Sequence, residues 1–170
     1  MKTRYQIGQS LFEIVVAIGV TAIIIVSLIS LSTSSVKNAT FSNSQVEASR
    51  YSQAAVEWLR AERDENWEDF RGHADDSLTY CLRTLSSSVW TDTSNWGGCS
   101  ANETIGTTIF RREVTFSCFL GGVPSATPTP LTCNESAVDT IHIRFSTRWQ
   151  DSQGTHEAEA GKYLTDWRSW

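Results

Sequence analysis

One carboxylate, Glu13, lies near the start of a long apolar stretch that contains no other charge. Residues 14–31 are eighteen consecutive uncharged residues, most of them aliphatic, and a membrane-spanning helix needs about that length. On insertion scales a carboxylate costs about 2.5–3.5 kcal/mol at the centre of a bilayer, and less near its edge. Glu13 therefore needs either a cationic partner or access to the lipid headgroups, which a side chain near the end of a span can reach.

The residues before Glu13 have a different chemistry. Lys2 and Arg4 are the only charged residues there, and Gly8 ends this short basic segment before the apolar stretch begins. In an ordinary secretory signal, by contrast, the small residues of the cleavage site follow the apolar stretch. By the positive-inside rule the basic residues place the N-terminus in the cytoplasm, so the rest of the chain is expected outside.

The segment from Gly8 to Glu13 resembles the prepilin signal of type IV pilins and of type II secretion pseudopilins. In that family a short basic leader ends in Gly, and the apolar run after it carries Glu at its fifth position. Glu13 is the fifth residue counted from Gln9, although Phe or Met is commoner than Gln at the first position. The resemblance implies that a membrane peptidase cleaves between Gly8 and Gln9 and methylates the new amino group of Gln9. It also implies that Glu13 pairs with that amino group on an adjacent subunit of a filament.

The resemblance further implies a function, partners and a location. The expected function is that of a minor pilin, a non-enzymatic structural subunit of a type IV pilus. The expected partners are other pilin subunits, the prepilin peptidase, the assembly platform of the inner membrane and membrane lipid. The subunit would cross the cytoplasmic membrane once, with its globular part outside, before it enters the extracellular filament. The ending of the chain, 148–167, loosely resembles that of one subgroup of minor pilins.

Two other functions remain compatible with the sequence. A minor pseudopilin of a type II secretion system uses the same leader and helix, so motifs do not separate it from a minor pilin. A signal-anchored extracytoplasmic domain that binds a ligand or acts as an enzyme would instead keep residues 1–8. The net charge of −5, from 14 basic and 19 acidic side chains, does not favour binding to nucleic acid by this subunit alone.

Four cysteines follow the apolar stretch and none precedes it. An even number in an exported domain favours disulfides, and four cysteines allow three connectivities. The sequential pairs Cys81–Cys99 and Cys118–Cys133 are expected because each brackets one loop of fewer than 20 residues. Each bond would contribute about 3 kcal/mol in the chain-entropy model. The spacing contains no C-x-x-C pair, so no metal site is expected.

No group of residues predicts catalysis. His73, His142 and His156 lie in a charged loop, on the polar side of an expected strand and in an expected hairpin, respectively. The chain has neither a Gly-x-Ser-x-Gly segment nor a glycine-rich phosphate loop, and its cysteines lack a convincing histidine partner. We therefore expect no catalytic residue and no cofactor.

One long helix is expected to carry Gly8, Gln9 and Glu13 into the rest of the chain. No proline occurs before Pro124 and no glycine between Gly19 and Gly72, so a helix is predicted over about 10–67. The chain would then consist of a leader, an apolar half of the helix, an amphipathic half and a globular α+β head domain. These parts are expected at 1–8, 9–31, 32–67 and 68–170.

The amphipathic half of this helix has apolar and small residues at spacings of three and four. This pattern predicts a face toward the core formed by Val36, Ala39, Asn43, Val46, Arg50 or Tyr51, Ala54, Trp58 and Ala61, widened by Val56 and Leu59. Hydroxyl residues at 30–35 form a weak point between the two halves, because their side chains compete for backbone hydrogen bonds.

The remainder of the chain indicates an α+β fold with a pilin-like layout, in which the long helix packs on a C-terminal antiparallel sheet. The spacing at 74–85 predicts a short amphipathic helix, and 86–106 is expected to be a loop. Alternating patterns predict strands at 114–120, 141–149 and 155–164, in a sheet of three or four strands.

The seven tryptophans are expected to serve different purposes. Trp58 and Trp149 fall on faces that are expected to meet the core, and Trp90 and Trp96 are expected to anchor the loop at 86–106. The C-terminal pair, Trp167 and Trp170, would cover a sheet edge or meet a neighbouring subunit.

Overall fold

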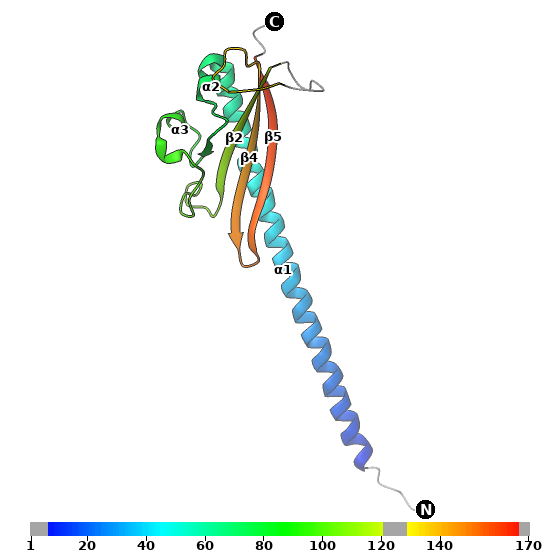
Figure 1. Cartoon of the computed structure of the whole chain (residues 1–170). Helices are drawn as coiled ribbons and strands as arrows, with labels where there is room; N and C mark the ends of the chain where they lie inside the picture. Colours follow the sequence, from blue (N-terminus) through cyan, green and yellow to red (C-terminus); the bar gives the residue numbers. More distant parts are fainter. Residues whose placement is uncertain (1–6, 121–128, 167–170) are drawn as a thin grey trace, which may run out of the picture. The chain divides into compact units, whose positions relative to one another are not determined.

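The structure is a computed structural model that describes residues 7–120 and 129–166. The chain divides into two compact units, Met1–Asn43 and Ser44–Trp170, whose described parts we call the N-terminal unit and the C-terminal unit. Figure 1 shows the elements, with β2, β4 and β5 side by side. In chain order they are α1 (Ile7–Glu65), α2 (Trp67–His73), β1 (Thr79–Cys81), α3 (Ser88–Thr91), η1 (Thr93–Asn95), β2 (Arg111–Leu120), β3 (Thr129–Leu131), β4 (Thr140–Asp151) and β5 (Gly154–Thr165).

Helix α1 is continuous over 59 residues, as the lack of breakers between Gly19 and Gly72 predicts. It ends at Glu65 rather than near Trp67, because Asn66 starts a second helix. The backbone of Asn66 is extended, and its side-chain oxygen accepts hydrogen bonds from the N–H groups of Glu68 and Asp69. An Asn in this position satisfies backbone donors that the first turn of α2 leaves open.

The hydroxyl side chains of α1 find partners within the helix itself. Thr21, Ser27 and Thr33 donate hydrogen bonds of 2.8, 2.8 and 2.9 Å to the carbonyl oxygens four residues earlier. The residues at 30–35, which the sequence marks as a weak point, remain helical. These hydroxyl groups therefore need no water, which matters for a helix in an apolar environment.

The C-terminal unit contains a five-stranded antiparallel sheet in the order β1-β2-β4-β5, with β3 also paired to β2. The strands predicted at 114–120, 141–149 and 155–164 are confirmed as β2, β4 and β5. Strand β3 is an addition, since no strand is predicted there. It contains Pro130, and proline is tolerated in a short strand at the edge of a sheet.

The face of α1 that packs against the sheet is formed mainly by small residues. Ala48, Ser52, Ala55 and Leu59 are buried at spacings of four, three and four residues. Val46 is 50% exposed and Ala54 and Ala61 are not buried, so the predicted core face is displaced around the helix. Leu59 is buried as predicted, but the prediction missed Ala48 and Ala55, because small residues lie on several sides of this helix and give a weak periodic signal.

Polar groups also join α1 to the sheet. The buried hydroxyl groups of Ser52 and Thr147 lie 2.8 Å apart. The guanidinium group of Arg112 on β2 donates 2.7 and 3.1 Å hydrogen bonds to the carbonyl oxygens of Tyr51 and Leu82. Arg112 is only 3% exposed, so this cation fixes two backbone segments from inside the unit.

The structure corrects the prediction for 74–85, which does not form a helix. The carboxylate of Asp75 accepts hydrogen bonds from the backbone N–H and the hydroxyl of Ser77, and this closes a turn. Strand β1 follows and pairs with β2. Tyr80, Cys81 and Leu82 are all buried, because the chain here is covered on both sides and shows no helical alternation.

The tryptophans of the C-terminal unit divide between core and surface. Trp149 is fully buried, as predicted, and its ring lies 5.8 Å from that of Phe110. Trp58 is half-buried and stacks on Trp90, with ring centroids 5.3 Å apart. The loop at 86–106 contains the short elements α3 and η1, and within it Trp90 is buried whereas Trp96 is 41% exposed. The residues Trp167 and Trp170 lie outside the described residues.

Candidate functional site

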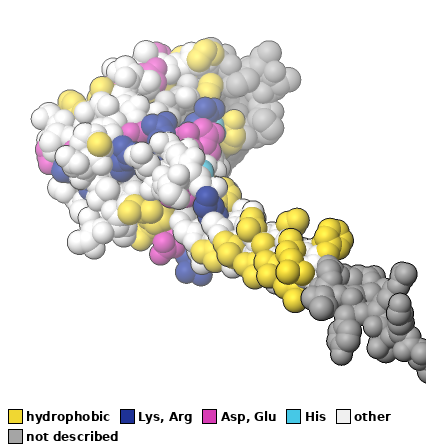
Figure 2. Space-filling view, turned by 90° about the horizontal axis from the view of Figure 1, so that it is seen from below, with side chains coloured by type: hydrophobic (Ala, Val, Ile, Leu, Met, Phe, Trp, Pro, Cys, Tyr) yellow, Lys and Arg dark blue, Asp and Glu magenta, His cyan; other side chains and the backbone are white. Residues whose placement is uncertain are grey.

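The N-terminal unit exposes a large apolar surface along α1. Figure 2 shows hydrophobic side chains gathered on this part of the helix. Consecutive residues are exposed, so the surface surrounds the helix and is not confined to one stripe. Between 46% and 72% of each of these side chains is accessible: Leu11, Phe12, Ile14, Val15, Val16, Ile18, Val20, Ile23, Ile24, Ile25, Val26, Leu28, Ile29 and Leu31. By its length and composition, this helix is long and apolar enough to cross a membrane.

Glu13 is exposed within this surface. No ion pair or side-chain hydrogen bond joins it to any residue that the structure describes. Lys37 is the next charged residue along α1, and 24 residues of helix correspond to about 36 Å. The carboxylate therefore has no intramolecular cation within reach among the described residues.

The expected cleavage point lies one helical turn before Glu13. Gly8 and Gln9 belong to the first turns of α1, where the structure describes their backbone only. Residues four apart lie on the same helix face, so Gln9 and Glu13 share one side of α1. The arrangement can therefore bind one positive charge near the start of the helix.

The four cysteines form two disulfides in the C-terminal unit. Cys81 joins Cys99 and Cys118 joins Cys133, with Cα–Cα distances of 4.8 and 5.1 Å. These are the sequential pairs that the sequence favours. The first bond ties β1 to the loop after η1, and the second ties β2 to the segment that follows β3.

The three histidines lie in three separate places and are not brought together. His73 stacks on Trp90, whereas the Nε2 atom of His156 lies 3.0 Å from Asp151 Oδ1. His142 stacks on Tyr163, and burial, with the charge of Arg144 as a smaller cause, lowers its pKa. Within the described residues, no three His, Cys, Asp or Glu side chains are grouped so that they could hold a metal ion.

The structural role of Arg112 was not predicted from the sequence. Burial lowers its pKa to about 10, but a guanidinium group with that pKa is still charged at neutral pH. A signal for its position does exist in the sequence. Arg112 alternates with Val114 and Phe116, so the period of a strand places it on the inward face of β2.

Comparisons of the chain with models of protein families, with curated proteins and with solved structures gave no match. The long apolar helix and the antiparallel sheet are compatible with a pilin-like fold. The function of this chain is consequently inferred from its own residues, above all from Glu13 and the apolar surface around it.

Proposed function

We propose that this chain is a minor pilin, a non-enzymatic subunit of a type IV pilus. In this proposal the peptide bond between Gly8 and Gln9 is cleaved, and the apolar part of α1 then joins the core of a filament. The observation that carries the proposal is the exposed apolar surface of the N-terminal unit with the single carboxylate of Glu13.

An apolar surface of this extent needs a cover other than water, because soluble proteins rarely expose large continuous apolar patches. Residues 14–31 correspond to about 27 Å of helix, close to the thickness of the hydrocarbon core of a bilayer. Lipid would cover this surface before assembly, and the same helices of neighbouring subunits would cover it in the filament. A surface that is apolar on all sides suits both environments.

The pairing of Glu13 gives the cleavage a physical purpose. Cutting after Gly8 removes Lys2 and Arg4 and creates an amino group at Gln9. In the filament this amino group would pair with Glu13 of an adjacent subunit, which neutralises two charges in an apolar surrounding. Because unpaired charges are costly there, the pair would also fix the position of one subunit along its neighbour.

The C-terminal unit would lie outside the cytoplasm, which agrees with its two disulfides. The prepilin peptidase and the assembly platform of the inner membrane would be the partners of the N-terminal unit. Other pilin subunits would then replace lipid as its partner during assembly.

Replacing Glu13 with Gln tests the pairing, because Gln keeps the size of the side chain and removes the charge. We expect membrane insertion to be unchanged or easier and incorporation into filaments to fall at least tenfold, measured by immunoblotting of sheared filaments. The control is Ser10→Ala, a change in the same first turns that leaves the carboxylate in place. Normal incorporation of the Glu13→Gln subunit would contradict the pairing.

A further inference from the structure

The C-terminal unit contains a cavity of about 520 Å³ that the filament proposal does not use. Sites for small ligands commonly have volumes of about 300–1,000 Å³. The cavity lies where the turn after α2, strand β1 and the segments around both disulfides meet. Its walls include Asp75, Asp76, Tyr80, Trp96, Thr132 and Asn134.

Among the described residues that line this cavity, Trp96 is the one tryptophan or tyrosine that is largely exposed. Trp90 is 5% exposed and stacks with both Trp58 and His73. Tyr80 is 3% exposed, and its hydroxyl group donates a 3.0 Å hydrogen bond to the carbonyl oxygen of His73. Trp96, in contrast, is 41% exposed. The cavity therefore has one exposed indole ring, which contacts the buried ring of Tyr80 edge-on with centroids 6.3 Å apart.

The backbone around Trp96 is held on both sides. The N–H group of Trp96 donates to Thr93 O at 3.1 Å, and those of Gly97 and Gly98 donate to Thr79 O at 2.8 and 2.9 Å. Both glycines have positive φ values, 93° and 87°, which other residues rarely adopt. These hydrogen bonds fix the backbone of residues 96–98, so the exposed indole ring is attached to an ordered turn.

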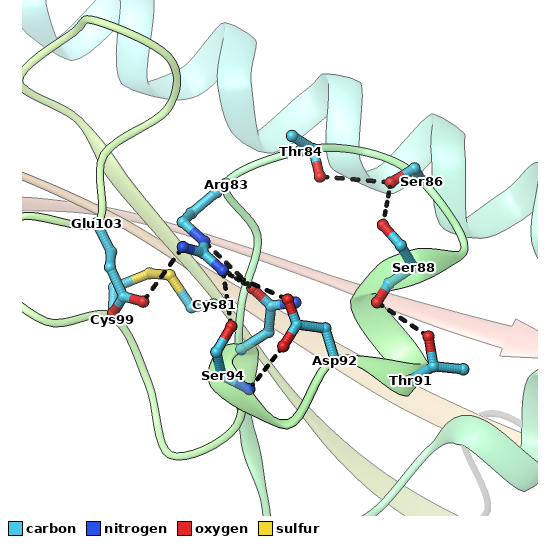
Figure 3. Close-up of polar contacts among 11 residues, drawn as sticks. Cys81, Arg83, Thr84, Ser86, Ser88, Thr91, Asp92, Ser94, Cys99 and Glu103 are labelled. Atoms are coloured by element: carbon cyan, nitrogen blue, oxygen red, sulfur yellow. Dashed lines mark hydrogen bonds and ion pairs between the residues drawn. A yellow bond between two sulfur atoms is a disulfide. The ribbon is translucent and has the colours of Figure 1, made fainter.

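Arg83 and a disulfide strengthen the same support, as Figure 3 shows. The guanidinium group of Arg83 donates hydrogen bonds of 2.8 and 3.2 Å to Asn95 Oδ1 and of 3.0 Å to Ser94 Oγ. The bond between Cys81 and Cys99 closes the loop that contains Trp96. A platform fixed in advance loses little entropy when a ligand binds.

The polar walls of the cavity are acidic and amide groups. Asp75 and Asp76 line it, and its described lining contains no Lys or Arg. Burial, with the negative charge of Asp75 as a second cause, raises the pKa of Tyr80 to about 12. Neither Asp76 nor Asn134 makes a side-chain hydrogen bond to another described residue. These groups can accept hydrogen bonds from hydroxyl groups, whereas an anion would be repelled.

We propose that this cavity binds a neutral sugar ring, part of an uncharged carbohydrate. The apolar C–H face of a pyranose would stack on Trp96, while its hydroxyl groups donate to the carboxylate of Asp76 and pair with the amide of Asn134. A quaternary amine fits less well, because aromatic cages surround such a cation with several open ring faces and this cavity offers one. All described residues of this cavity belong to the C-terminal unit, so sugar binding can be tested independently of filament assembly.

Saturation-transfer NMR on the full chain in lipid nanodiscs tests the proposal, since nanodiscs avoid detergents with sugar headgroups. The probes are glucose, galactose, mannose and N-acetylglucosamine, with glucuronic acid and choline as the anionic and cationic comparisons. We expect at least one neutral sugar to bind with a dissociation constant in the millimolar range. Trp96→Ala should weaken that binding at least tenfold, Trp96→Phe should weaken it less, and Asp76→Asn should weaken it severalfold.

The matched control is Tyr163→Ala, which removes an aromatic side chain that is 47% exposed on β5, outside this cavity. Binding should be unchanged in this variant. Circular dichroism verifies that each variant is folded. Binding of choline alone, binding of no probe, or sugar binding that persists in folded Trp96→Ala would each overturn the proposal.

Discussion

The two units of this chain use the same apolar residue types in opposite ways. In the N-terminal unit the large aliphatic side chains of α1 are exposed, and hydroxyl groups such as that of Thr21 bond back to the helix. In the C-terminal unit most of the large apolar side chains are buried, and small residues of α1 face the sheet. One helix therefore contributes to both arrangements, and among the described residues the buried ones of α1 lie in its C-terminal part.

The two units therefore differ in the source of their stability. The C-terminal unit has a core, two disulfides and buried polar bonds of its own. In the described part of the N-terminal unit the chain is a single helix whose large aliphatic side chains are exposed. In the proposed filament subunit, lipid or neighbouring subunits cover these side chains. Changes of the same chemical kind should consequently have different effects in the two units.

The largest expected difference comes from two leucines of the same helix. Leu59 is fully buried, so Leu59→Ala should lower the free energy of unfolding of the C-terminal unit by about 2–5 kcal/mol. Leu28 is 60% exposed, and Leu28→Ala should leave that free energy unchanged. Urea unfolding of the full chain in nanodiscs, followed by tryptophan fluorescence, measures both. Equal effects of the two substitutions would remove the distinction between the units.

The next effect concerns the disulfides. Replacing Cys118 and Cys133 together with Ala should cost about 3 kcal/mol in the free energy of unfolding, because the unfolded chain loses a constraint. Membrane insertion of the N-terminal unit should not change. Non-reducing peptide mapping of the unaltered chain should give Cys81–Cys99 and Cys118–Cys133, and a peptide that joins Cys81 to Cys133 would contradict the pairing.

A smaller effect is expected at the buried cation. Arg112→Lys keeps the charge, but an ammonium group lacks the planar fork that reaches both carbonyl oxygens. The free energy of unfolding of the C-terminal unit should therefore fall by about 1–3 kcal/mol. The neighbouring substitution Arg111→Lys is the control and should change the free energy of unfolding by less than about 0.5 kcal/mol. If both substitutions have the same small effect in urea unfolding, Arg112 does not hold α1 to the sheet.

Much of this fold could be predicted because its signals are local. The strands around Phe116 and Ile143 alternate cleanly, and the long helix lacks breakers over most of its length. The end of α1 could not be placed, because Asn66 both stops one helix and caps the next. The turn at Asp75 imitates a helix cap, and only the pairing of β1 with β2 shows that a strand follows.

Glu13 and the cavity beside Trp96 also differ in how local their sequence signals are. Glu13 stands out because a single charge beside a long apolar stretch can be recognised from the sequence alone, without knowledge of the fold. The cavity beside Trp96 has no such signal, since its walls come from separate stretches of the chain between residues 72 and 134. The face of α1 at Ala48 and Ala55 was mispredicted because small residues carry little periodic signal, although they decide how closely a helix and a sheet approach.

The central claim is that the chain is cut after Gly8 so that a new amino group becomes available to Glu13. Intact-mass measurement of the protein from cells with and without prepilin peptidase tests it most directly. When the peptidase is present, we expect the mass to fall by that of residues 1–8 and the new N-terminus to be Gln9. An unchanged mass, with Met1 or Lys2 still on the chain in both strains, would contradict it.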